Sequence, residues 1–180
     1  NMVDQIFIGQ GIGLLGNAAT NVAFPITTVV LAISVMLGIG GSANFNLLSG
    51  QKKEEEAKKY LGCSFTLQVV ISVVLMLIVL IFLRPILKGF GATESVLPYA
   101  VTYTWITALG IPLYVISQSG AHLIRSDGAP TFSMACGITG AILNLILDPL
   151  FIFVFKWGMM GAAVATVLGQ VVTAVLAIWY

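Results

Sequence analysis

The chain has 180 residues, of which 58% are hydrophobic and only 8% are charged. Soluble domains carry roughly 25% charged residues, and a soluble protein of this size could not bury so much apolar surface. The formal net charge of +1 offers no basic face to nucleic acid. The composition therefore predicts an integral membrane protein and excludes a nucleic-acid partner.

Membrane-spanning helices need about 20 mostly apolar residues, because the hydrocarbon core of a bilayer is about 30 Å thick. Long intervals without Asp, Glu, Lys or Arg alternate here with loops that carry charges and turn residues. Residues 1–9 are typical of the end of a helix whose start is missing, so we expect a piece of a longer protein. The fold predicted for residues 1–180 is an all-α bundle of about six transmembrane helices, the first truncated. The complete spans are predicted at residues 17–45, 62–84, 98–123, 130–155 and 160–180.

The predicted orientation follows from the basic residues of the loops, which favour the cytoplasmic side. The loops at 49–59 and 125–130 share one side of the membrane, and the remaining loops share the other. The first side holds Lys52, Lys53, Lys58, Lys59 and Arg125, against Arg84, Lys88 and Lys156 on the second. The first pair of loops is therefore expected in the cytoplasm of a multi-pass protein of the plasma (inner) membrane.

The first loop contains a G-x-G-x-x-G pattern that resembles a dinucleotide-binding fingerprint. Gly11, Gly13 and Gly16 form it, but the fingerprint requires a preceding strand and a soluble βαβ unit. Because a membrane span follows, we interpret it as a glycine-rich turn. The charged run at 52–59 is interpreted as the solvated start of a helix.

Three titratable side chains are interpreted as structural and not as parts of a functional site. His122 lies three residues before Arg125 and is interpreted as an interfacial side chain, with a proton relay as the alternative. Cys63 and Cys136 lie in apolar stretches, away from other metal ligands. They are therefore expected to be small buried hydrophobic residues.

Small residues recur four apart in several spans and can let helices approach closely. The pairs are Gly137 with Ala141, Gly158 with Ala162, and Gly161 with Ala165. Glycine and alanine are also common in all membrane helices, so close packing and simple abundance explain these pairs equally well, and neither indicates a function.

Asp4 and Asp148 are the residues that ordinary packing explains least, because both lie inside predicted spans. A charged aspartate at the centre of a bilayer costs roughly 2.5–3.5 kcal/mol on insertion scales, and such residues commonly line ion or substrate pathways. Asn144 precedes Asp148 by one helical turn, so the two share a helix face. Pro149 has no N–H, so the helix is expected to break beside Asp148, as happens where backbone lines a cavity.

The depths of the polar residues are compatible with a single site. Asp148 lies about 12 Å and Asp4 about 8 Å from the outer ends of their helices. Tyr103 and Thr166 fall at similar depth. Carboxylate, amide and hydroxyl oxygens suit Na⁺ or a proton better than a soft metal. The alternative is a polar cluster that only holds helices together.

At these residues the chain resembles the multidrug and toxic compound extrusion (MATE) family of transporters. The resemblance is carried by VDQIFIG (3–9) with AFPI (23–26), GIGGSANFNLLSGQKKEEEAKKYLG (38–62), LIRSDGAPTFSM (123–134), AILNLILDPLFIF (141–153) and GMMGAAVATVLGQ (158–170). It implies one six-helix lobe of a twelve-helix transporter, which exports organic, often cationic, drugs in exchange for Na⁺ or H⁺. The partners it implies are a small organic substrate, a monovalent cation, the bilayer and a second lobe.

The resemblance also assigns roles to individual residues. Asp4, Asn144 and Asp148 match the family's first-lobe cation site, Thr166 matches its sixth-helix threonine, and Tyr103 fits its fourth-helix tyrosine. Na⁺ binding is therefore expected at Asp4, Asn144, Asp148 and Thr166. No cofactor is expected beyond the coupling ion.

Other functions stay open at this point. A related flippase or exporter of a lipid-linked or other non-drug substrate would share these helices. A membrane scaffold without transport activity would tolerate replacement of both aspartates. No hydrolase, kinase or redox motif occurs in the sequence, so an enzyme is not expected.

Overall fold

The computed structural model describes residues 2–180, except for the side chains of residues 2 and 3; Asn1, the first residue of the expected helix stub, lies outside the described residues. Every element in the described range is helical. In chain order these are α1 (Met2–Gly11), α2 (Leu14–Gly50), α3 (Glu54–Ile81), α4 (Leu83–Gly89), α5 (Leu97–Leu109), α6 (Ile111–Ser126), α7 (Pro130–Pro149), the π-helical segment η1 (Leu150–Val154) and α8 (Met159–Trp179).

The helices confirm the predicted all-α membrane fold. In the described residues, α2, α3, α7 with η1, and α8 are each long and apolar enough to cross a membrane. The pair α5 and α6 also qualifies as one span, bent by 55° at its break. The sequence predicted this third span at 98–123 as a single helix, and its division at Gly110 is a correction. Pro112, in the first turn of α6, has no N–H and cannot continue the hydrogen-bond ladder of α5.

Two predicted connections are shorter than expected. The loop expected at 49–59 is reduced to a turn at 51–53, because α2 continues to Gly50 and α3 already begins at Glu54. Lys52 takes a positive φ of 59° in that turn. The glycine-rich segment 9–17 is also mostly helical, and only Ile12 and Gly13 separate α1 from α2.

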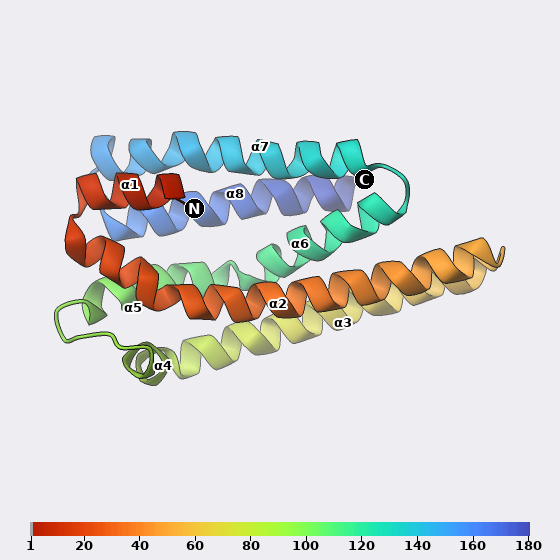
Figure 1. The fold of residues 1–180 in the computed structure, drawn as a ribbon, viewed down its shortest axis with the longest axis horizontal. Coiled ribbons are helices and arrows are strands. Elements are labelled where there is room, and N and C mark those ends of the chain that lie inside the picture. The colour runs from red at the N-terminus through yellow and green to blue at the C-terminus, as the bar shows by residue number, and fades with distance from the viewer. Residues whose placement is uncertain (1) are drawn as a thin grey trace.

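The connections alternate between the two ends of the bundle (Figure 1). The α2–α3 turn and the α6–α7 loop lie at the same end as the C-terminus, whereas the α1–α2 turn, α4 and the η1–α8 loop lie at the other. This arrangement agrees with the alternating loops used for the predicted orientation. The side that faces the cytoplasm stays a prediction.

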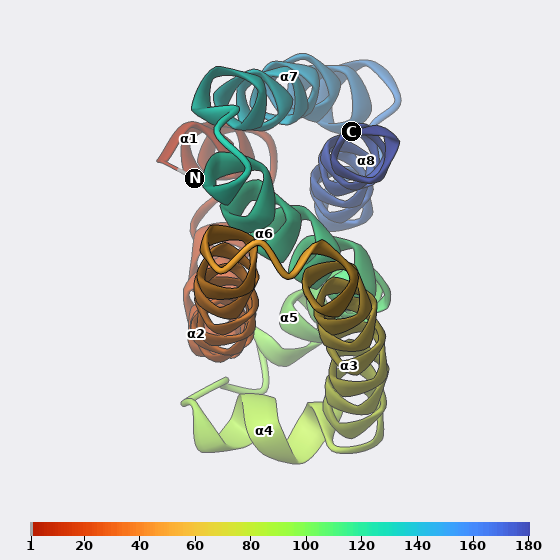
Figure 2. The same ribbon diagram turned by 90° about the vertical axis from the view of Figure 1, so that its right-hand side faces the viewer.

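Helix α6 occupies the middle of the bundle. It contacts α2 and α3 on one side and α7 and α8 on the other, as the end-on view shows (Figure 2). Where it crosses α2, a Cβ on Gly38 would lie 2.9 Å from the Cα of Ser119 and 3.1 Å from the His122 ring. His122 is therefore partly buried between α2 and α6, near the end of α6 that leads into the α6–α7 loop. This position is compatible with the interfacial role predicted for it.

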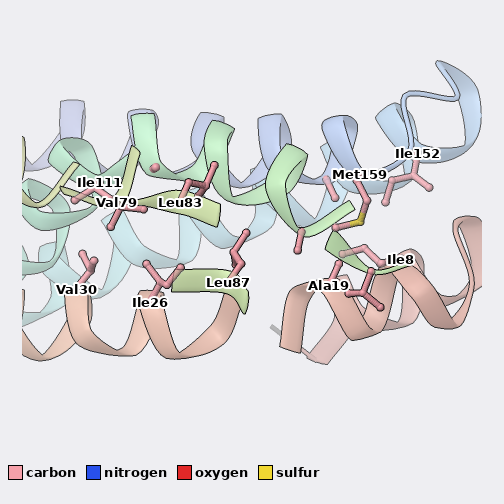
Figure 3. Close-up of a cluster of buried hydrophobic side chains, with 14 of the residues drawn as sticks. Ile8, Ala19, Ile26, Val30, Val79, Leu83, Leu87, Ile111, Ile152 and Met159 are labelled. Carbon is pink, nitrogen blue, oxygen red and sulfur yellow. The ribbon is translucent and has the colours of Figure 1, made fainter. Parts of the chain in front are cut away.

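The buried hydrophobic core packs against the first half of α2, from Ala19 to Val30, in the part of the bundle that also holds α4 and the start of α8 (Figure 3). Its larger side chains include Ile8, Ile26, Val30, Val79, Leu87 and Ile111. Outside this core, many large apolar side chains point away from the protein; on α3 they include Val70, Val74, Leu77, Ile78 and Ile81. An apolar exterior of this extent suits lipid, not water.

The structure decides between the two interpretations of one small-residue pair, and it shows that the prediction for Cys63 was wrong. A Cβ on Gly137 would meet nothing within 4 Å, so the Gly137–Ala141 pair does not mark a close helix contact. Cys63 is exposed, whereas Cys136 is buried as predicted. An apolar stretch does not by itself distinguish the protein interior from the lipid-facing surface, since both are apolar in a membrane protein.

Candidate functional site

A cavity of about 470 Å³ lies between α1, α2, α5, α6, α7 and α8. Four residues that the sequence placed in one site contribute to its lining: Asp4, Tyr103, Asn144 and Thr166. Asp148, the fifth, is not part of the lining and is only 1% exposed. The structure therefore brings all the predicted site residues to one region, with Asp148 buried behind the cavity wall.

Asp148 and Asp4 form the electrostatic centre of this region. Their carboxyl groups lie close enough to interact, although one belongs to α7 and the other to α1. Both side-chain oxygens of Asp148 are buried, and the described side chain that interacts with them is the carboxyl group of Asp4. Because two carboxylates in an apolar setting repel each other, this pair is suited to share a proton or to hold a cation.

Tyr103 and Thr166 complete the same group from α5 and α8. The Tyr103 side chain hydrogen-bonds to Thr166 and interacts electrostatically with both Asp4 and Asp148. The Thr166 hydroxyl also donates to the carbonyl oxygen of Ala162 at 2.9 Å. Because that hydroxyl donates its only proton to the backbone, it can act only as an acceptor toward Tyr103 or a cation.

Asn144 lies one turn before Asp148 on α7 and is 6% exposed. Its Nδ2 has no partner among the described residues. The amide therefore stands beside the carboxyl pair with unused hydrogen-bonding capacity, which a buried polar group rarely keeps.

The helix that carries Asp148 changes its winding directly after that residue. Pro149 ends the regular part of α7, and the segment Leu150–Val154 continues as a π-helix. The Phe155 N–H bonds to the Leu150 carbonyl at 3.0 Å, which is the wider π-helical spacing. The predicted interruption beside Asp148 is thus confirmed, and π-segments of this kind are frequent at functional sites.

Helix α1 approaches this interruption through a glycine. A Cβ on Gly11 would collide with Ile152 of η1. Ile8, one turn earlier, is 1% exposed in the core. Close contact at Gly11 holds α1 against α7, η1 and α8, and thereby fixes the helix that carries Asp4.

The cavity also has polar residues that the sequence analysis missed. Thr104, Thr107, Gln118, Gln170 and Thr173 all contribute to its lining. Gln170 follows Thr166 by four residues on α8, and this spacing of polar residues in an apolar span was the available signal.

The cavity lining has an acidic side chain and, in the described part of the chain, no basic one. Among the described residues that line it, Asp4 is the charged side chain, and none is Lys, Arg or His. Uncharged hydroxyl and amide groups supply the remaining polar surface. Such a lining favours neutral or cationic ligands over anions.

Comparison with known proteins identifies the family. The model of the family described as MatE matches residues 1–150. A FAD transporter of Shewanella oneidensis is 32% identical over 176 residues, which cover 96% of this chain and 39% of that protein. The multidrug export protein MepA of Staphylococcus saprophyticus is 28% identical, over 94% of this chain and 38% of that protein.

Solved structures agree with the sequence relatives. The inward-facing conformation of a multidrug resistance MATE family transporter of the MOP superfamily matches 99% of this chain with a TM-score of 0.94 and 27% identity. The match covers 40% of that structure. This chain thus spans about two fifths of the length of its relatives, and it belongs to the MATE family of multi-pass plasma-membrane transporters.

Proposed function

We propose that this chain forms the ion-coupling lobe of a multidrug efflux transporter, which exports organic cations in exchange for Na⁺ or H⁺. The observation that carries the proposal is Asp148, a carboxyl group in a membrane span that is only 1% exposed and lies against the carboxyl group of Asp4. As a member of a transporter family, the protein is not an enzyme.

The proposed coupling uses the helices that meet at the carboxyl pair. A cation or proton bound there reduces the repulsion between Asp4 and Asp148. It also gives α1, α7 and α8 a shared ligand, with Asn144 and Thr166 as further oxygen donors. Binding then favours the conformation in which α1 packs against the other two helices, and release favours its displacement.

Exchange follows because the cavity and the carboxyl pair share Asp4. A cationic substrate in the cavity and a coupling cation at the carboxyl pair compete for the same negative charge. Arrival of one therefore promotes departure of the other, which is the thermodynamic requirement for antiport.

The named relatives suggest different substrates, and the cavity helps to choose between them. The FAD transporter is described as carrying a dinucleotide, whereas MepA is described as exporting drugs. Among the described residues that line the cavity, none is Lys, Arg or His, the side chains that commonly bind phosphates. We therefore favour organic cations, with a flavin nucleotide as the second candidate because of the 32% identity.

The test compares transport by the full-length protein with that of its Asp148→Asn variant. We expect the variant to lose cation-driven efflux while remaining in the membrane. Asp127→Asn is the matched control, because Asp127 is an exposed loop carboxylate that accepts a hydrogen bond from Tyr180 at 2.7 Å. Undiminished, cation-dependent efflux by Asp148→Asn would overturn the proposed coupling and favour a scaffold or a differently driven flippase.

A further inference from the structure

Helix α1 folds back on the start of α2, and two asparagines one turn apart on α2 contact it. A Cβ on Gly9 would lie 2.7 Å from the Asn17 Nδ2, so the Asn17 amide lies directly against the backbone of α1. One turn further along both helices, the Gln5 Nε2 donates to the Asn21 Oδ1 at 3.2 Å. The two contacts therefore belong to one antiparallel register, in which Gly9 is opposite Asn17 and Gln5 is opposite Asn21.

The hydrogen bond between Gln5 and Asn21 lies beside the proposed ion site. Gln5 directly follows Asp4 in the chain, and both residues line the cavity. Gln5 and Asn21 are exposed, so neither side chain belongs to the buried core. Their bond is formed in the same arrangement in which the carboxyl group of Asp4 lies against that of Asp148. The free energy of this bond therefore favours that arrangement of α1.

Asn21 also lies on a turn of α2 whose backbone ladder is interrupted. Pro25 lies inside α2 and has no N–H, so the Asn21 carbonyl oxygen lacks the donor that a helix normally supplies four residues later. The Thr27 and Thr28 hydroxyl groups donate to the Phe24 carbonyl oxygen at 2.8 and 3.0 Å. Prolines and hydroxyl-to-backbone bonds of this kind accompany bends in helices. This turn of α2 can therefore adjust when α1 is displaced.

We infer that the hydrogen bond between Gln5 and Asn21 is a latch, which positions Asp4 beside Asp148 and opens when α1 is displaced during exchange. Gln5 and Asn21 are positioning residues, because they act on the coupling cation through Asp4. The inference rests on the proposed cation-coupled export and adds a requirement to it. Loss of the latch weakens cation binding, since the packed arrangement of α1 becomes less favourable. The maximal rate of exchange is retained, since the carboxyl pair itself is unchanged.

The experiment measures efflux of ethidium, a fluorescent organic cation, by the full-length protein in lipid vesicles. Efflux is driven by a Na⁺ gradient, or by a pH gradient if H⁺ is the coupling ion. We expect Gln5→Leu and Asn21→Leu each to raise the half-maximal cation concentration about threefold, as loss of one hydrogen bond between membrane helices predicts. The maximal rate should stay the same. Because Asn21 is not part of the cavity lining, its variant removes the bond without altering the cavity surface.

Three further variants separate the latch from a general effect on structure. The double variant Gln5→Leu with Asn21→Leu should be no weaker than either single variant, because both changes remove the same bond. The exchanged pair Gln5→Asn with Asn21→Gln keeps both amides and should restore the cation affinity of the unmodified protein. Gln10→Leu is the matched control on α1, since Gln10 is exposed and its side chain has no hydrogen bond to the described residues.

The outcomes distinguish this inference from the function on which it rests. Ethidium efflux by the unmodified protein that does not respond to a cation gradient would overturn the proposed function, and the latch with it. Cation-dependent efflux in which Asn21→Leu behaves like Gln10→Leu would overturn the latch alone. So would single-variant effects that multiply in the double variant, or a lower maximal rate at an unchanged half-maximal cation concentration.

Discussion

Gly140 on α7 and Gly169 on α8 bring the backbones of their helices into direct contact. A Cβ on Gly140 would lie 2.9 Å from the Gly169 carbonyl oxygen, and a Cβ on Gly169 would lie equally close to the carbonyl of Gly140. Small residues at such crossings let membrane helices pack closely. This crossing lies one turn from Asn144, so it also sets the spacing of α7 and α8 beside the proposed ion site.

Replacement of Gly169 by Val should therefore destabilise the protein by about 1–3 kcal/mol, because the new side chain would meet backbone that cannot move aside easily. Thermal unfolding in detergent measures the effect. Gly137→Val is the control on α7, since a Cβ there meets nothing within 4 Å. An equal loss of stability in both variants would contradict the importance of the crossing.

A buried hydrogen bond joins α3 to α6. The Ser119 hydroxyl lies 2.6 Å from the Gln68 Oε1 and 2.7 Å from the Val115 carbonyl, while Gln68 is fully buried. Ser119→Ala leaves the Gln68 oxygen without its donor and should cost about 1–2 kcal/mol. Gln68→Met should cost less, because Ser119 can still donate to Val115. If unfolding measurements show a larger loss of stability for Gln68→Met than for Ser119→Ala, the hydrogen bond contributes little to stability.

Cation binding should stabilise the full-length protein. A ligand at about 100 times its Kd adds roughly 2.7 kcal/mol to the free energy of unfolding. We expect Na⁺, or acid if H⁺ is the coupling ion, to raise the melting temperature of the unmodified protein but not of Asp148→Asn. Thr166→Val should reduce the response without abolishing it, because it removes one oxygen of several. A full Na⁺ or acid response in Asp148→Asn would place the ion elsewhere.

The break between α5 and α6 depends on the small size of Gly110. Its Cβ position lies 2.7 Å from the Gln170 oxygen and 2.9 Å from a Val167 methyl group. Gly110→Ala should therefore displace the flexible Gln170 side chain more than it unfolds the protein. We expect transport to fall several-fold, with a loss of stability near 1 kcal/mol. Loss of stability of about 3 kcal/mol or more would indicate that the break is a rigid packing contact.

Much of this molecule follows from its sequence. The helices and their order were predictable because long apolar stretches have one common solution in a bilayer, the α-helix. The residues of the proposed ion site could also be selected individually, because a carboxyl group such as Asp148 is costly in lipid unless something binds it. Tyr103 and Thr166 were expected in the group from their similar depth, and the resemblance to the MATE family matched both to positions of the family's site.

Only the tertiary structure decided which polar residues meet and which remain unpaired. Depth along a span does not specify the direction of a side chain, so the sequence could not separate Gln170, in the cavity, from polar residues that hold helices together. Nor could it show that Cys63 is exposed, or that Gly140 and not Gly137 forms the close crossing. In a membrane protein the lipid and the protein interior are both apolar, so hydrophobicity places a residue in the membrane without indicating its neighbours.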